Sequence, residues 1–180
     1  YYIILLNLCN WGGVIANLGI PKLVLKSSSI SRSIKFFSIF KKGLLQFIFL
    51  VAFIMLLSII KADIGAYQMI IICSVGISSL VYQLITKAYQ GINSLSFSAV
   101  FSDSLLSIMV QWILILLLLL MNKTIEPETL VLTIAVSNLI SICILLLYLK
   151  TKNLLDFRFN QTKIVEEFRV ILSNSYQLYI

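Results

Sequence analysis

The sequence predicts an all-α fold, a polytopic bundle of transmembrane helices, and three observations carry that prediction. The chain of 180 residues is 60% hydrophobic and only 12% charged, whereas a soluble domain is about 45–50% apolar and about 25% charged. Its mean hydropathy is +1.03. Uncharged apolar runs also follow one another with only short connections. This composition excludes a soluble enzyme, a disordered segment and a nucleic-acid-binding protein.

The apolar runs have the length of membrane-spanning helices. A hydrocarbon core of about 30 Å requires about 20 apolar residues in a helix. The runs lack the alternating segments of about ten residues that are typical of β-barrels. We expect about five full spans and the start of a sixth at Val170. The five runs are Tyr1 to Pro21 (continuing into Leu23–Leu25), 43–60, 64–86, 104–121 (starting earlier, near Ser96) and 129–149.

The basic residues predict the orientation of these spans. Lysine and arginine are enriched in cytoplasmic connections of membrane proteins. Six lie in segment 22–42, one in 87–95 and five in 150–169, against one each in the alternate connections 61–63 and 122–128. The first three segments are therefore expected to be cytoplasmic.

The ends of the sequence suggest a piece of a longer protein. The chain begins Tyr1-Tyr2-Ile3 without methionine and ends inside an apolar run. With the predicted orientation, the first run enters from the outside, so an earlier span would precede it if the N-terminus of the parent is cytoplasmic. We expect an internal fragment.

The basic segment 30–42 has two possible interpretations. Ile30, Ile34 and Phe37 recur at helical spacing, with basic residues mostly elsewhere on the helix. Such a pattern is typical of a short helix lying on an anionic leaflet. An equally acceptable interpretation is a solvated, positively charged loop.

Polar residues inside the apolar runs form stripes. At 100° per residue, each set occupies one face of its helix. Polar side chains of this kind commonly hydrogen-bond between packed helices, but several stripes in one bundle also suggest a shared polar cavity. The stripes are Asn7, Asn10 and Asn17; Gln68, Ser79, Tyr82, Gln83, Thr86 and Gln90; Ser104, Ser107 and Gln111; and Ser137 and Ser141 with Asn138 beside them.

Three charged residues are further candidates for a site. Asp103 is the one acidic residue expected within a span, near its cytoplasmic end. It suits coupling to a proton or sodium ion, or an interfacial position paired with Lys87. Lys22 and Lys26 follow Gly19-Ile20-Pro21, a sequence expected to break or bend the first helix. They suit either a phosphate-binding site or ordinary membrane topology.

The motifs of enzymes are missing from this sequence. It has no histidine, no nucleotide-binding glycine loop and no paired carboxylates in an external connection. Cys9, Cys73 and Cys143 lie inside apolar runs without metal-ligand spacing and are expected to be small buried hydrophobic residues. We therefore expect no enzyme activity, cofactor, metal site or nucleic-acid partner, and we favour a transporter.

Two short segments carry a resemblance to a known family. Residues 17–26, Asn-Leu-Gly-Ile-Pro-Lys-Leu-Val-Leu-Lys, resemble the end of the second span in polysaccharide flippases. Residues 86–91, Thr-Lys-Ala-Tyr-Gln-Gly, resemble the end of their fourth span. The chain is similar over most of its length to Wzx-type O-antigen flippases of the multidrug/oligosaccharidyl-lipid/polysaccharide exporter superfamily.

The resemblance implies two six-helix lobes around a cavity that opens alternately to each side of the bacterial inner membrane. Residues 1–169 would then form most of the N-terminal lobe with its cytoplasmic linker, and 170–180 would start the second lobe. The cargo would be undecaprenyl-pyrophosphate-linked oligosaccharide, with membrane lipids and glycan polymerase or assembly proteins as further partners. Lys26 would attract the pyrophosphate, and the polar stripes would contact the sugars. The resulting substrate-binding candidates are Lys26, Lys22, Asn7, Asn10, Asn17, Gln68, Gln83 and Gln111, with Asp103 as the candidate for ion coupling.

The sequence departs from the family in two respects. Segment 170–180 lacks the proline that is common early in the seventh span of relatives, and the apolar runs hold no deeply buried arginine. Two alternatives therefore stay open. One is an ion-coupled drug or cation antiporter of the same superfamily, and the other is a structural membrane subunit without transport activity.

Overall fold

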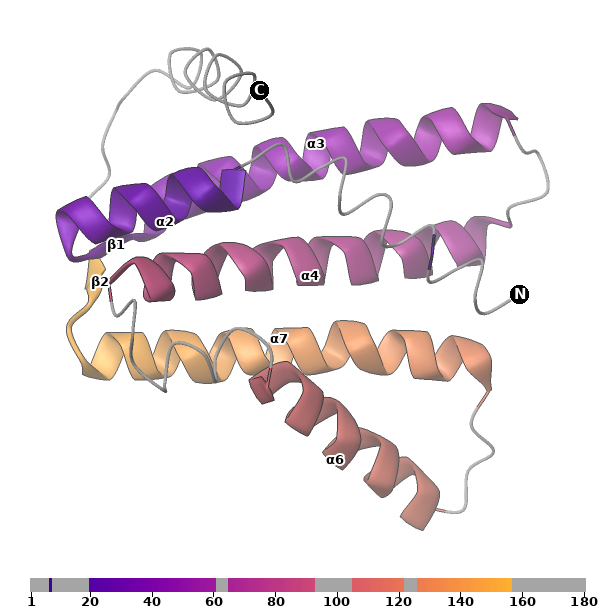
Figure 1. Ribbon diagram of the computed structural model, residues 1–180. Coiled ribbons are helices and arrows are strands. Elements are labelled where there is room, and N and C mark those ends of the chain that lie inside the picture. Colours follow the sequence, from indigo (N-terminus) through magenta and orange to yellow (C-terminus); the bar gives the residue numbers. More distant parts are fainter. Residues whose placement is uncertain (1–6, 8–19, 61–64, 93–104, 122–125, 157–180) are drawn as a thin grey trace.

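The computed structural model describes residues 7, 20–60, 65–92, 105–121 and 126–156 (Figure 1). Within these residues the chain forms five helices and two short strands, so the all-α prediction is confirmed for this part. The elements are α2 (Ile20–Ser31), β1 (Ile34–Lys35), α3 (Phe36–Ile60), α4 (Ala66–Ile92), α6 (Leu106–Leu120), α7 (Pro127–Thr151) and β2 (Leu155–Asp156).

Three of the helices, α3, α4 and α7, are long and apolar enough to cross a membrane. They contain the predicted runs 43–60, 64–86 and 129–149 almost entirely. The fourth predicted run corresponds to α6, an apolar helix of 15 residues that is shorter than a full span. Most of the first run and all of the sixth lie outside the described residues. The number of about five spans therefore stays a prediction.

Helix α4 lies at the centre of the bundle and packs against α2, α3 and α7 (Figure 1). One buried cluster joins Val24 of α2 and Leu84 of α4 to Leu145 of α7. A second joins Leu50 of α3 and Ile72 of α4 to residues of α7 closer to its start. The central helix thus contributes to both hydrophobic clusters.

Two glycines of α4 allow neighbouring helices to approach closely. A Cβ atom at Gly91 would overlap the carbonyl oxygen of Leu25 in α2 and would lie 3.0 Å from Cβ of Ser28. At Gly76 it would lie 2.7 Å from Cδ2 of Leu50 in α3. Small residues at such crossings are typical of membrane helix pairs, which associate through close van der Waals contact.

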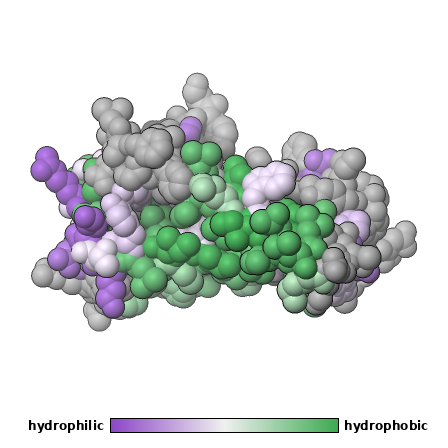
Figure 2. All heavy atoms as spheres, turned by 90° about the horizontal axis from the view of Figure 1, so that it is seen from below, coloured by the Kyte–Doolittle hydropathy of each residue, from purple (hydrophilic) through white to green (hydrophobic). Residues whose placement is uncertain are grey.

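The two strands join the most basic segments at one end of the bundle. They pair in parallel, with Ile34 opposite Leu155 and Lys35 opposite Asp156. Helix α4 finishes at this end. Helix α7 begins at the other end, with Glu126 just before it and Glu128 in its first turn (Figure 1). The described parts of the three segments predicted to be cytoplasmic therefore lie together, and we call this end the basic end. Figure 2 shows hydrophilic side chains gathered there and hydrophobic side chains over the middle of the visible face.

Segment 30–42 adopts neither of its two predicted conformations. Helix α2 stops at Ser31 because Arg32 has a left-handed backbone conformation, with φ 48°. Ile34 then enters β1, where its amide donates a hydrogen bond of 2.8 Å to the carbonyl of Leu154, and it is only 1% exposed. Ile30, Ile34 and Phe37 belong to α2, β1 and α3, so the expected apolar face of one helix does not form. The residues from Phe36 onward are the first turns of helix α3.

Helix α7 ends in a compact turn that positions β2. Asn153 has φ 55°, a conformation that asparagine tolerates better than most residues. The amide of Leu154 donates to the carbonyl of Leu149 at 3.0 Å, and the amide of Asn153 donates to the carbonyl of Lys150 at 3.1 Å. These bonds satisfy carbonyl groups at the end of the helix, as in other left-handed helix caps.

The expected burial of the cysteines is wrong for one of them. Cys143 is exposed on α7 and Cys73 is half-buried on α4, while Cys9 lies outside the described residues. The exposed side of α7 also carries Leu139, Ile144 and Leu147. An apolar side of a spanning helix is stable without protein cover where it faces lipid.

Candidate functional site

Four polar side chains from three helices meet between α4, α6 and α7. The Nδ2 atom of Asn138 in α7 donates to Oγ of Ser79 in α4 at 3.0 Å. Its Oδ1 atom accepts a hydrogen bond of 2.6 Å from Oγ of Ser107 in α6. The hydroxyls of Ser107 and Ser137 lie 3.5 Å apart. We call Ser79, Ser107, Ser137 and Asn138 the polar cluster.

The polar cluster lies near the middle of the bundle. Asn138 is close to the midpoint of α7 and Ser79 to the midpoint of α4. Asparagine suits this position because its amide offers both donor and acceptor, and serine is small enough to let helices approach. Helix α6 begins here and then diverges from α7 (Figure 1), and it buries no residue. The polar cluster therefore fixes α6 to the bundle near its start.

We expect a measurable coupling between Asn138 and Ser79. The single substitutions Asn138→Ala and Ser79→Ala should each lower the stability of the full-length protein, but the double substitution should cost less than their sum. The expected coupling is about 0.6 kcal/mol, the average of interhelical hydrogen bonds in membranes. A double-mutant cycle on unfolding in detergent micelles measures it. Strict additivity of the two substitutions would contradict the bond.

A line of polar residues continues from the polar cluster along α4. Ser79, Gln83, Lys87 and Gln90 fall within an arc of about 80° and cover about 16 Å of the helix axis. Gln83 is exposed, and Lys87 and Gln90 are half-buried. Nζ of Lys87 donates a hydrogen bond of 2.8 Å to Oε1 of Gln90. This polar track leads from the middle of the bundle to the basic end.

The other members of the predicted stripe on α4 lie elsewhere. Tyr82 and Thr86 are buried, and the hydroxyl of Thr86 donates to the carbonyl of Gln83 in its own helix at 3.0 Å. Oε1 of Gln68 accepts a hydrogen bond of 3.1 Å from the amide of Gly65, at the end of α4 away from the basic end. Gln83 is thus the predicted site residue of α4 that joins the polar track.

Lys22 and Lys26 lie on α2, which begins at Ile20 with Pro21 as its second residue. Gly19 lies outside the described residues, so the predicted break or bend at Gly19-Ile20-Pro21 stays a prediction. Both side chains are exposed. They lie on the side of α2 opposite Ile20, Val24 and Ser28, the residues that α2 buries. The structure therefore does not bring these lysines onto the polar track, although all of them lie toward the basic end.

The remaining candidates are dispersed or lie outside the described residues. Asn7 is helical and exposed, and Gln111 is half-buried on α6. Asn10, Asn17 and Asp103 fall outside the described residues. Ser79, Ser107 and Asn138 themselves form interhelical hydrogen bonds, as one of the two interpretations of their stripes predicted.

Sequence reasoning placed the members of the polar cluster on stripes but did not bring them together as a site. The signal was the position of one asparagine and one serine near the midpoint of two apolar runs. Ser141, one turn after Ser137, adds a fully buried hydroxyl with no hydrogen-bond partner within the described part of the chain. The described residues contain no group of acidic, histidine or cysteine side chains that could hold a metal ion.

Comparison of the chain with known protein families, with curated proteins and with solved structures gives no match.

Proposed function

We propose that this chain belongs to a flippase that moves undecaprenyl-pyrophosphate-linked oligosaccharide from the cytoplasmic to the outer leaflet of the bacterial inner membrane. The observation that carries the proposal is the polar track on α4. The track includes Gln83, an exposed glutamine in the sequence of a helix that is long and apolar enough to span the membrane. A polar side chain at such a position is stable where it faces water, protein or a polar cargo rather than lipid.

The opposite side of α4 supports the same proposal. Ile77, Val81 and Ile85 lie about 120–160° around the helix from Gln83 and border an apolar groove between α3 and α7. The central helix is therefore amphipathic across the bundle. An amphiphilic cargo needs a polar path for its sugars, while its lipid tail stays in the bilayer. Rocking of two lobes around the polar path would provide alternating access.

The basic end supports the proposed direction of entry. Exposed lysines there include Lys22 and Lys26 on α2 and Lys150 at the end of α7. Cationic side chains attract phosphate groups and are favoured on the cytoplasmic side of membranes. A pyrophosphate-bearing cargo would meet this end before it reached the polar track.

The antiporter alternative requires a carboxylate inside the bundle. The acidic residues that the structure describes are Glu126, Glu128 and Asp156, and all three lie at helix ends or in a strand. Asp103 lies outside the described residues. Asp103 therefore remains the candidate carboxylate for the antiporter.

A deletion experiment on the full-length parent gene tests the proposal. In its native host, deletion should cause lipid-linked oligosaccharide to accumulate on the cytoplasmic leaflet while synthesis continues. Restoring the gene should relieve the accumulation. Normal surface glycan without accumulation would reject the flippase, and loss of drug or cation efflux in the same strain would support the antiporter.

We expect Lys26→Gln to lower flipping by about fivefold without loss of protein from the membrane. One lysine near an anionic group at the membrane surface contributes about 1 kcal/mol, which corresponds to about fivefold in binding. Lys152→Gln is the matched control, because Lys152 is also exposed at the basic end but lies past the end of α7. Wild-type transport by a well-expressed Lys26→Gln variant would exclude a phosphate-binding role for Lys26.

A further inference from the structure

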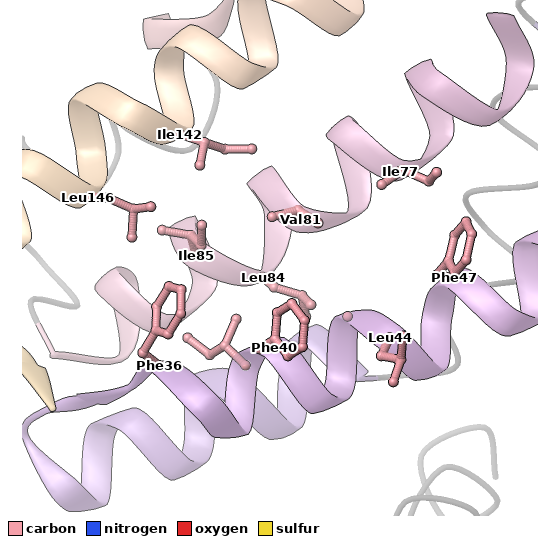
Figure 3. A pocket seen from close by; sticks show the side chains of 12 residues that line it. Phe36, Phe40, Leu44, Phe47, Ile77, Val81, Leu84, Ile85, Ile142 and Leu146 are labelled. Carbon is pink, nitrogen blue, oxygen red and sulfur yellow. The ribbon is translucent and has the colours of Figure 1, made fainter. Parts of the chain in front are cut away.

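An open apolar groove of about 390 Å³ lies between α3, α4 and α7. Its walls contain apolar side chains and one glycine, and the side chains point toward a common space (Figure 3). Phe40, Leu44 and Phe47 of α3 remain between 38% and 62% exposed. The lining residues are Phe36, Ile39, Phe40, Gly43, Leu44, Phe47, Ile77, Val81, Leu84, Ile85, Ile142 and Leu146.

The length of the groove matches one leaflet of a bilayer. From Phe36 to Phe47 it covers about 16 Å along α3, close to half of a hydrocarbon core of about 30 Å. Phe36 is the first residue of α3, so the groove starts at the basic end and finishes near the middle of the helix. These dimensions fit an acyl chain that enters from one membrane surface.

Two lysines stand at the mouth of the groove. Ile142, Leu146 and Lys150 recur every four residues and share one side of α7, so Lys150 continues the groove wall by one turn toward the basic end. Lys35, in β1, directly precedes Phe36. Both lysines are exposed. A ligand whose chain fills the groove would hold its headgroup within reach of these cations.

We propose that the groove binds one acyl chain of an anionic phospholipid from the leaflet at the basic end, with the lipid phosphate at Lys35 and Lys150. The apolar walls exclude a polar occupant, the length fits a chain confined to one leaflet, and the charge at the mouth selects an anionic headgroup. The groove lies on the side of α4 away from the polar track. The bound phospholipid is therefore separate from the proposed cargo path, and this inference does not depend on the proposed function.

Photo-crosslinking tests the proposal in the full-length protein reconstituted in phosphatidylcholine vesicles. The vesicles carry a trace of phosphatidylglycerol or of phosphatidylcholine with a photoreactive diazirine in the acyl chain. Peptide mapping should place the phosphatidylglycerol adducts on the groove residues Phe40, Leu44 and Leu146. We expect about 25-fold more adducts at these positions from phosphatidylglycerol than from phosphatidylcholine, because each of the two lysines confers about fivefold.

Two variants separate the chain site from the headgroup site. Gly43→Leu should fill the groove and abolish adducts from both probes at these positions. Lys150→Gln should lower the preference for phosphatidylglycerol about fivefold and leave the part conferred by Lys35, whereas Lys152→Gln, about 200° around the helix, should retain the full preference. Equal labelling by both probes, or labelling spread evenly around α3 and α7, would overturn the proposal. A groove that carries no adducts, because another part of the protein fills it, would also overturn the proposal.

Discussion

Replacing Gly91 with alanine is expected to lower the stability of the full-length protein by about 2–3 kcal/mol, at the upper end of the cost of overpacking. The added Cβ would overlap the carbonyl oxygen of Leu25 and press on the backbone amide of Ser29, 3.1 Å away. Backbone atoms of a helix cannot rotate aside as a side chain can. Helix α2 would therefore have to move away from α4. The shift in the midpoint of thermal unfolding in detergent measures this loss.

Two other glycines provide a graded control. At Gly76 the added Cβ would meet the side chain of Leu50 at 2.7 Å, and a side chain can yield by changing its rotamer. Gly76→Ala should therefore cost less than Gly91→Ala. At Gly43 the nearest atom is Cδ1 of Leu84 at 3.6 Å, an ordinary contact, and alanine also favours the helix by up to about 1 kcal/mol. Equal losses at all three positions would show that the α2–α4 approach is not specially close.

The apolar runs predicted the three long apolar helices but made them too short. The predicted second span begins at Gly43, whereas α3 begins at Phe36; the third ends at Thr86, whereas α4 continues to Ile92. Lys41, Lys42 and Lys87 interrupted the runs without interrupting the helices. Lysine is a good helix former, and its long side chain can extend to the membrane surface. Uncharged runs mark the extent of the hydrocarbon layer more directly than the ends of helices.

The short strands could not be predicted from local pattern. Ile34 and Leu155 are far apart in the sequence, and each contributes to a strand of two residues. The helical spacing of Ile30, Ile34 and Phe37 favoured a helix over the same residues. Pairing with β2 and the left-handed turn at Arg32 override that preference. Such tertiary effects are absent from a periodicity argument.

The faces of the helices were easier to predict than their meeting points. A stripe fixes which residues share one side of a helix, but it does not fix how the helix is rotated in the bundle. Ser79 and Asn138 therefore met as the stripes allowed, whereas Lys22 and Lys26 lie on the outer side of α2. Only the packing of Ile20 and Val24 against the rest of the bundle determines that rotation.

Gln83→Leu is expected to reduce transport about tenfold while the protein remains in the membrane at its normal level. If Gln83 hydrogen-bonds a sugar headgroup that has lost water, its loss raises the barrier by about 1–1.5 kcal/mol, or about tenfold in rate. The side chain is exposed, so leucine leaves no cavity in the core, and the level of protein in the membrane checks that folding is preserved. The rate of appearance of lipid-linked oligosaccharide on the outer leaflet measures the effect.

Two variants distinguish a role of the amide from a general effect of an altered α4. Gln83→Asn keeps an amide on the polar track and should retain more transport than Gln83→Leu. Tyr67→Leu also replaces an exposed polar residue of α4 with leucine, but Tyr67 lies about 160° around the helix from Gln83 and near the start of the helix. Its transport should match the wild type. If Gln83→Leu transports normally, the polar track is not the cargo path, and the exposed glutamine serves contacts with other parts of the protein. If Tyr67→Leu is as impaired as Gln83→Leu, transport depends on α4 as a whole, and the amide of Gln83 has no specific role.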